Sequence, residues 1–321
     1  MKIDVTRDVF QLAQVFTISR GSRTEAKVLT VCLQDGHHMG WGECVPYARY
    51  DETLESVEAQ IRRLPETFTR ADLYDLLDAG AARNAVDCAL WDMEAKRAGK
   101  AVWQLAGLNK PWPEITAYTL SLGTRDAMQK QASENAFRPL LKIKLGTPDD
   151  MPRLEAVRRG APKSRIIIDA NEGWSADVYA DLAPHLVGLG VELVEQPLPA
   201  GEDDALSEIE RPLPVCADES CHDRDSLPKL KGKYDVVNIK LDKTGGLTEA
   251  LALKEAALAQ GYQVMVGCMV GSSLAMAPAT LLAQGALVTD LDGPLLLAED
   301  RATPLQFDAA GVHPPSSKLW G

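Results

Sequence analysis

The pattern that most constrains the fold begins at residue 115, where short apolar runs start to alternate with longer stretches typical of helices. These stretches include DAMQKQASENAF, ADVYADLAPHLVGLG and LTEALALKEAALAQG, each long enough for several helical turns. Continuous apolar strands that alternate with helices predict a parallel sheet, and eight strand units predict a closed (β/α)₈-type barrel. The eight runs are ITAYTLSLG, LLKIKLG, RIIIDAN, VELVEQP, VCADES, VVNIKLD, YQVMVGC and LVTDLDG.

Both ends of this pattern differ from a simple barrel. The first hundred residues predict a mixed α+β unit, with a hairpin that turns at the Asp-Gly pair of AKVLTVCLQDGHHMGWGE. Residues 81–99 predict a helix with one apolar face, ended by Gly99. KPWPE, at 110–114, is expected to be a linker because its prolines block regular structure. After the eighth run, PLLLAEDRATPLQF is expected to return to the first unit, so the last barrel helix is weak or absent.

Charge and composition exclude several classes of protein. The net charge of −12 argues against nucleic-acid and anionic-membrane partners, because the overall field repels them. The N-terminus lacks the apolar core of a signal peptide and no run of 18 apolar residues occurs, so we expect a cytoplasmic protein. The six cysteines form no CxxC pair and are expected to be free thiols without a metal or nucleophile role.

Five charged residues follow the predicted strands at regular intervals. The steps are 25 residues from Lys144 to Asp169, 26 to Glu195, 23 to Asp218 and 22 to Lys240. One strand, its helix and its loops occupy about this length in a barrel of about 250 residues. We therefore expect all five side chains at the C-terminal ends of consecutive strands, where barrel enzymes carry out their chemistry.

The three acidic members of this series predict a metal site. A single acidic residue at a strand end is usually a turn or cap residue. Asp169, Glu195 and Asp218 in one barrel mouth would instead repel each other unless they shared a cation. Oxygen ligands of this kind suit Mg²⁺ or Mn²⁺.

The lysines predict the reaction. In LLKIKLG, Lys142 and Lys144 share one face of a strand, which taken alone indicates a solvated face. Lys144 and Lys240 would, however, lie across the barrel from each other, on both sides of the metal ligands. A substrate carboxylate on the metal would then place its α-carbon between two amines, while the cation stabilises the enediolate. Lys142 would lower the pKa of Lys144 and bind the carboxylate. Two opposed bases predict a 1,1-proton transfer, and hence a racemase or epimerase.

With these motifs in place, the chain resembles the muconate-lactonizing-enzyme subgroup of the enolase superfamily. The matching elements are KIK at 142–144, DAN at 169–171, EQP at 195–197, ADES at 217–220 and NIKLDKTGG at 238–246. The resemblance implies a modified TIM barrel of (β/α)₇β type with an α+β capping domain. The implied division is a capping domain at 1–112, the barrel with the active site at 113–298 and a C-terminal segment at 299–321 that returns to the capping domain.

Within this subgroup the chain is most similar to the dipeptide epimerases, which interconvert L-Ala-D-Glu and L-Ala-L-Glu. TDLDG resembles the acidic pair that holds the dipeptide ammonium group, and RGSRTEA resembles the mobile capping loop that selects the side chain. The resemblance implies one Mg²⁺ per site, with Mn²⁺ as a possible substitute, a dipeptide substrate and a role in murein peptide recycling; the oligomeric state is left open. The implied substrate-binding residues are Arg23, Thr119, Asp290 and Asp292, and the residues expected to orient the metal ligands are Asn171 and Glu219.

Other functions remain open on the sequence. N-acylamino-acid racemase, o-succinylbenzoate synthase and cycloisomerase share the fold, but they give no reason for an ammonium-binding acidic pair. A Schiff-base lysine barrel has no use for three converging carboxylates, and a non-catalytic binding protein has no need for the whole set. Asp218 stands where many members of the superfamily carry Glu, so the reach of this ligand has to be tested by structure.

Overall fold

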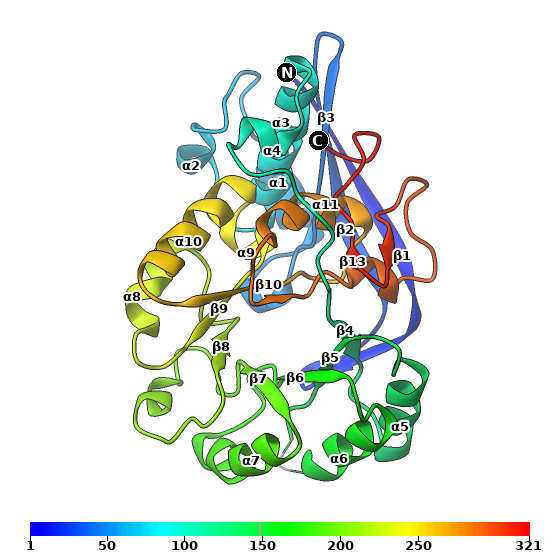
Figure 1. The fold of residues 1–321 in the computed structure, drawn as a ribbon. Coiled ribbons are helices and arrows are strands. Elements are labelled where there is room, and N and C mark those ends of the chain that lie inside the picture. Colours follow the sequence, from blue (N-terminus) through cyan, green and yellow to red (C-terminus); the bar gives the residue numbers. More distant parts are fainter. Residues whose placement is uncertain (148) are drawn as a thin grey trace.

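The computed structural model describes residues 1–147 and 149–321 and contains the predicted barrel (Figure 1). Its strands form one sheet in which every neighbouring pair is parallel. The sheet closes where Thr116 bridges Thr289 and the Ala117 N–H donates to the Thr289 carbonyl at 2.8 Å. In sheet order the strands are β4 (Tyr118–Leu120), β5 (Leu140–Lys144), β6 (Arg165–Asp169), β7 (Val191–Glu195), β8 (Val215–Ala217), β9 (Val236–Ile239), β10 (Gln263–Val266) and β11 (Val288–Thr289).

A layer of buried side chains fills the barrel below its C-terminal mouth. Each strand from β5 to β11 contributes one residue to this interior layer. For β4 the contributing residue is Ala117, directly before the strand. Because side chains alternate along a strand, the residues two positions further on also point inward and form the next layer. The interior layer consists of Ala117, Leu140, Ile167, Leu193, Cys216, Val236, Met265 and Val288.

Helices cover the outside of the barrel unevenly. Only a 3₁₀ turn follows β7 before β8 and again follows β11, within the part of the chain that the structure describes. The predicted weakness of the last barrel helix is therefore confirmed. In residues 1–147 and 149–321 no helix is both long and apolar enough to cross a bilayer. The helical elements are α5 (Arg125–Glu134), α6 (Met151–Gly160), α7 (Ala176–Gly188), η2 (Asp204–Ser207), η3 (Arg224–Ser226), α8 (Leu227–Leu230), α9 (Leu241–Thr244), α10 (Leu247–Ala259), α11 (Ser273–Leu282) and η4 (Gly293–Leu296).

The N-terminal residues form a cap of one antiparallel sheet and several helices. The predicted hairpin is confirmed, since Asp35 pairs with His38 across a turn in which Gly36 has a φ of +61°. The β3 glycines allow α3 to approach closely: a Cβ on Gly42 would lie 2.1 Å from the Ala85 carbonyl oxygen. The cap consists of β1 (Lys2–Ile18), β2 (Gly21–Asp35), β3 (His38–Cys44), η1 (Ala48–Tyr50), α1 (Leu54–Arg62), α2 (Leu73–Leu76), α3 (Ala81–Ala98) and α4 (Val102–Leu105).

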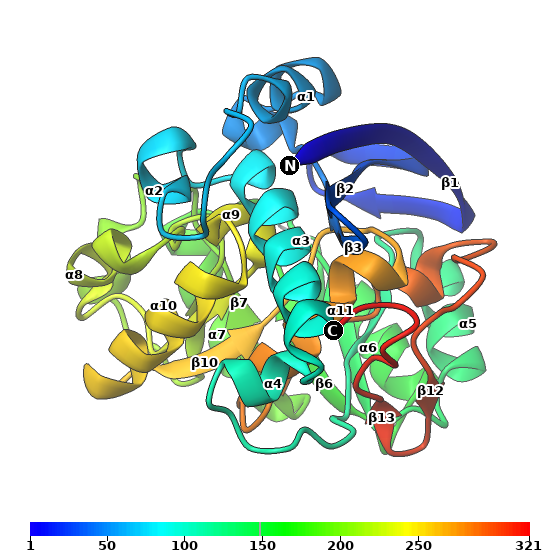
Figure 2. The same cartoon turned by 90° about the horizontal axis from the view of Figure 1, so that it is seen from above.

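Helix α3 corrects one expectation. Its bounds and its Gly99 cap match the prediction, but every residue from Ala81 to Met93 is buried rather than one face alone. The helix lies between the cap sheet and helices α9 and α10 of the barrel (Figure 2). The polar residues on the side of α3 that faces the barrel are therefore buried against it. Among them, Asp87 accepts a hydrogen bond from the Thr248 N–H at 3.0 Å.

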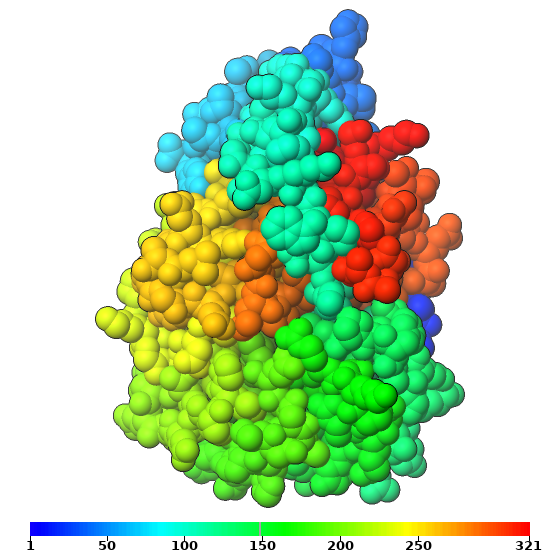
Figure 3. All heavy atoms as spheres, in the orientation of Figure 1, coloured from blue at the N-terminus to red at the C-terminus, as the bar shows by residue number. Residues whose placement is uncertain are grey.

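The segment after the barrel returns to the cap. Ala298 N–H donates to the Gln11 carbonyl at 2.8 Å, and Arg301 pairs with the buried Glu43 of β3 at 2.7 Å. The indole N–H of Trp320 donates to the Cys88 carbonyl of α3 at 3.0 Å. In the space-filling view this last segment packs against the end of the cap (Figure 3). It also carries strands β12 (Phe307–Asp308) and β13 (Gly311–Val312). The domain boundaries at residues 112 and 298 stay a prediction.

A buried carboxyl group joins the cap to the barrel. Asp242, in α9, accepts hydrogen bonds from the Val45 N–H at 3.0 Å and from the Asn84 amide at 2.8 Å. Burial raises the pKa of Asp242 to about 7, and the nearby carboxylates of Glu52 and Glu43 add to the rise. The unfolded value is about 3.9.

This pKa shift makes stability depend on pH. The folded protein holds an extra proton on Asp242 between about pH 4 and 7, so its contribution to stability falls as pH rises through that window. From pH 5.5 to 7.5 we expect Asp242 to lower the free energy of unfolding by about 1–2 kcal/mol. Urea unfolding of Asp242→Asn should lack this part of the pH dependence. The exposed Asp225→Asn should retain it, and equal slopes in all three proteins would contradict the assignment.

Candidate active site

The predicted metal ligands converge at the C-terminal mouth of the barrel. Asp169 ends β6, Glu195 ends β7 and Asp218 follows β8, each two positions beyond a member of the interior layer. One carboxylate oxygen from each lies within 4.8 Å of the others, and all three residues are buried. The register pairs Asp169 with Glu195 directly, which brings neighbouring strand ends level.

These carboxylates suit a divalent cation. Burial, followed by repulsion from Asp169, raises the pKa of Glu195 to about 7. A shared cation would remove that cost, since it attracts the ionised form of every ligand. Hard oxygen donors fit Mg²⁺ or a similar ion. Asp218 belongs to this cluster, so a shorter Asp at this position reaches the shared centre.

The lysines of β5 are buried inside this site. Lys142 is 2% exposed, and its ammonium lies 2.6 Å from Glu195, 2.7 Å from Asp290 and 3.1 Å from Asp169. Burial alone would lower the pKa of Lys142, but these carboxylates outweigh it and hold its pKa well above the usual value. Lys144 lies 2.6 Å from Asp169. The alternative of a solvated lysine face is therefore wrong for this strand.

Lys240 approaches the cluster from the other side. It directly follows β9, and three strands separate β9 from β5 in the sheet order. Its ammonium lies 2.5 Å from an oxygen of Asp218. Burial opposes its charge, but Asp218 and Glu195 hold the pKa of Lys240 well above its usual range, and the same attraction holds that of Asp218 well below.

Three further residues, not among those predicted from the sequence, hold these ligands in place. Lys243 pairs with Asp218 at 2.7 Å, and Asn238 donates to Glu195 at 2.7 Å. The Gln196 side-chain oxygen accepts the Asp218 N–H at 2.9 Å, and its backbone φ is +36°. Asn238 shares the inward face of β9 with Lys240, so strand periodicity could have identified it. Gln196 and Lys243 stand within the motifs EQP and NIKLDKTGG, and membership of these motifs was the signal that could have identified them.

The predicted ammonium site lies beside Lys142. Asp290 and Asp292 follow β11, and both are buried. The Thr119 N–H donates to Asp292 at 2.6 Å, which joins the ends of β4 and β11. One oxygen of Asp290 is buried without a hydrogen-bond partner among the described residues. Burial, followed by the charge of Asp290, raises the pKa of Asp292 to about 6.

The capping loop closes over the site through an arginine that the sequence analysis did not select. Arg20 lies 2.8 Å from Glu219 and 3.0 Å from Glu172, both in barrel loops. Arg23, from the same loop, lines the cavity, and its guanidinium carbon lies 5.7 Å from the centre of the Tyr47 ring. Asn171 donates its backbone N–H to Asp169 at 2.9 Å.

One cavity thus collects ten of the twelve predicted site residues. Asp169 and Glu195 do not line it; they lie behind the ammonium groups of the β5 lysines. The predicted residues that line the cavity are Arg23, Thr119, Lys142, Lys144, Asn171, Asp218, Glu219, Lys240, Asp290 and Asp292.

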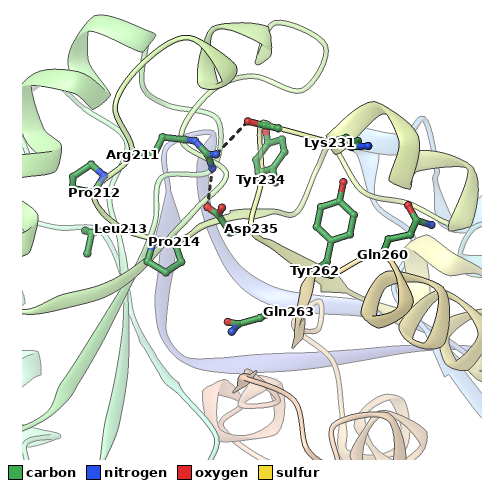
Figure 4. A pocket seen from close by; sticks show the side chains of 12 residues that line it. Arg211, Pro212, Leu213, Pro214, Lys231, Tyr234, Asp235, Gln260, Tyr262 and Gln263 are labelled. Atoms are coloured by element: carbon green, nitrogen blue, oxygen red, sulfur yellow. Dashed lines mark hydrogen bonds and ion pairs between the residues drawn. The ribbon is translucent and has the colours of Figure 1, made fainter.

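A wide hollow of about 750 Å³ lies at the opposite end of the barrel, near the starts of β8, β9 and β10 (Figure 4). Its charged pair is Arg211 and Asp235, 2.7 Å apart, and Arg211 also donates to the Gly232 carbonyl. Asp235 in turn accepts the Val215 N–H. Arg211 and Asp235 are therefore paired with each other and with backbone groups.

Comparisons with known proteins give matches to both parts of the chain. The family model for the mandelate racemase / muconate lactonizing enzyme N-terminal domain matches residues 1–107, and the enolase C-terminal domain-like model matches residues 124–315. An L-Ala-D/L-Glu epimerase from Escherichia coli is 47% identical over 317 residues, covering 97% of this chain and 99% of the relative. An N-acetyl-D-glutamate racemase from Pseudoalteromonas is 46% identical over 300 residues, covering 92% and 95%.

A solved structure is also similar along the whole chain. It is an enolase family member from Agrobacterium tumefaciens with homology to dipeptide epimerases, and it contains bound sodium and L-Ala-L-Glu. The two chains are 52% identical with a TM-score of 0.97, and the match covers 99% of each.

Proposed function

Since the chain belongs to the mandelate racemase / muconate lactonizing enzyme family of the enolase superfamily, we propose that it is an isomerase that epimerises L-Ala-D-Glu and L-Ala-L-Glu. The observation that carries the proposal is the placement of Lys144 and Lys240 on opposite sides of three converging carboxylates. The E. coli relative and the neighbour that holds L-Ala-L-Glu support the choice of dipeptide.

The two lysines would act on the α-carbon of the glutamate residue. One amine removes the α-proton from one face, and the other returns a proton to the opposite face, which inverts the centre. Lys142, on the same face of β5 as Lys144, would donate a charge-assisted hydrogen bond to the substrate carboxylate. All three lysines are buried, which limits the number of water molecules that can compete for the proton.

Asp169, Glu195 and Asp218 would hold one Mg²⁺, with Mn²⁺ as a substitute. When bound, the ion polarises the substrate carboxylate and stabilises negative charge that develops next to the α-carbon. Lys243, Asn238 and Gln196 keep the ligands in place by their hydrogen bonds to them or to the adjacent backbone.

The remaining residues would select the dipeptide. Asp290 and Asp292 offer carboxylate oxygens to the α-ammonium group of alanine. Arg23, which lines the cavity, would bind the glutamate side-chain carboxylate, for which a guanidinium supplies two parallel donors. Thr119, which lines the same cavity, would contribute its hydroxyl to the substrate.

The similar racemase gives a second candidate substrate, N-acetyl-glutamate. It shares the glutamate centre but lacks the ammonium group, so it would forgo the contact proposed for Asp290 and Asp292. We therefore expect a clear preference for the dipeptide.

The test is a direct assay in D₂O with Mg²⁺, in which NMR follows the α-proton of the glutamate residue. L-Ala-L-Glu and L-Ala-D-Glu should each exchange that proton and interconvert, whereas N-acetyl-L-glutamate should react more slowly by tenfold or more. The opposite order would favour the second candidate, and exchange with none of the three would end the proposal.

We also propose that murein peptides, which contain L-Ala linked to D-Glu, supply the substrate in the cytoplasm. A strain without this protein should then fail to use L-Ala-D-Glu as a source of glutamate. Normal growth of that strain on the dipeptide would contradict this role without affecting the reaction itself.

A further inference from the structure

A second, smaller cavity adjoins the active-site cavity on the side of β1 and β4. Three residues line both cavities and therefore form the partition between them: Phe16, Thr119 and Leu296. Phe16 and Leu296 are apolar and half-buried. The other residues around the second cavity are Ala13, Gln14, Val15, Tyr118, Ser121, Gln131 and Leu295.

Backbone contacts hold this partition in place. The pairing of β1 with β2 is irregular between Gln11 and Phe16. Near this irregularity the Gln11 carbonyl instead accepts a hydrogen bond from the Ala298 N–H. Leu12 forms a bridge with Leu297 next to this irregularity. Just beyond Phe16, the Thr17 N–H donates to the Ser121 hydroxyl at 2.6 Å, which fixes β1 to the loop after β4. Hydrogen bonds thus connect the segments that form the wall of the second cavity.

The partition lies beside the groups assigned to the substrate ammonium. Thr119 belongs to the partition and donates its N–H to Asp292. Leu296 lies in η4, which begins directly after Asp292. In an L-Ala-Glu dipeptide, the carbon that carries the ammonium group also carries the side chain of the first residue. An ammonium held at Asp290 and Asp292 therefore brings that side chain close to the partition.

Building on the proposed function, we propose that Phe16 and Leu296 set the size limit for the first residue of the dipeptide. The second cavity is then the subsite for a longer first side chain. In the native protein the partition keeps the substrate out of this cavity. The native enzyme acts on dipeptides with a small first residue such as alanine. The second cavity accepts aliphatic side chains once Phe16 or Leu296 is replaced by a smaller residue. Gln14 and Gln131 add hydrogen-bonding groups to the wall of this cavity.

The experiment compares L-Ala-L-Glu with L-Leu-L-Glu on the full-length, Mg²⁺-loaded protein. The measured quantity is the ratio of kcat/KM for the leucyl to the alanyl dipeptide. We expect Phe16→Ala and Leu296→Ala each to raise this ratio at least about tenfold, since a few methylene groups in an apolar pocket are worth that much. Phe16→Leu should give a smaller rise.

Ile18→Ala is the matched control. Ile18 lies on the same face of β1 and lines the active-site cavity but not the second one, so its ratio should change less than twofold. Thermal melting of each variant shows whether it is folded, and Leu296→Ala and Phe16→Leu keep the test valid if Phe16→Ala is unstable.

The outcomes separate the two proposals. Failure of the native protein to turn over either dipeptide would overturn the proposed function. Turnover of L-Ala-L-Glu with an unchanged ratio in the folded partition variants would overturn the size limit alone, as would an equal rise in Ile18→Ala.

Discussion

Lys240→Ala is expected to lower the turnover of L-Ala-L-Glu by about 10³-fold, the usual contribution of a positioned general acid or base. Lys144→Ala should have a similar effect, because each epimer needs one lysine to take the proton and the other to return it. Both variants should stay folded. Asp218 keeps its contact with Lys243 when Lys240 is removed, and Asp169 keeps Lys142 when Lys144 is removed.

The sharper result is an asymmetry in isotope exchange. With one lysine left, each variant should still exchange the α-proton of one epimer in D₂O without inverting it, and the two variants should exchange opposite epimers. The exposed Lys130→Ala on α5 serves as the control and should match the native rate. Loss of exchange with both epimers in either variant, or full turnover, would contradict the two-base assignment.

Glu195→Gln should abolish the response to Mg²⁺. The substitution keeps the size of the side chain but removes the negative charge of one ligand. Replacing groups that merely orient a ligand costs about 10–100-fold in metal affinity. Loss of a ligand charge should cost more, so we expect a Kd for Mg²⁺ raised by more than about 100-fold in calorimetry. Turnover should fall about 10³-fold or more.

The control for this variant lies on the same strand. Glu192 points outward from β7 and pairs with Arg165 at the surface, so Glu192→Gln should bind Mg²⁺ as the native protein does. EDTA should remove the native activity, and added Mg²⁺ or Mn²⁺ should restore it. Activity that survives EDTA, or Mg²⁺ binding that is unchanged in Glu195→Gln, would refute the metal assignment.

Local sequence patterns were sufficient to predict the barrel and the positions of its strand ends. The strand that holds Lys142 and Lys144 shows why: period-2 alternation decides which side chains point inward, and closure of the sheet brings all inward residues of one layer together. The interval from Lys144 to Asp169 reflects one strand–helix unit, so spacing along the chain translates into adjacency at the mouth.

Contacts between distant segments were not predictable in this way. Arg20 meets Glu219, 199 residues further along, because the cap folds over the barrel. Arg301 reaches Glu43 over a separation of 258 residues. Helix α3 shows the same limit, since its polar residues look solvent-facing in the sequence until α9 and α10 cover them. Such contacts depend on how whole elements pack.

The interior layer of the barrel separates residues that stabilise the fold from residues of the active site. Its eight apolar side chains fill the barrel interior below the charged groups. The charged groups lie beyond this layer, toward the C-terminal ends of the strands. Substitutions meant to change substrate specificity can therefore be made beyond this layer, at the C-terminal ends of the strands, with little loss of stability. Substitutions within the interior layer would lower thermal stability without creating a new specificity.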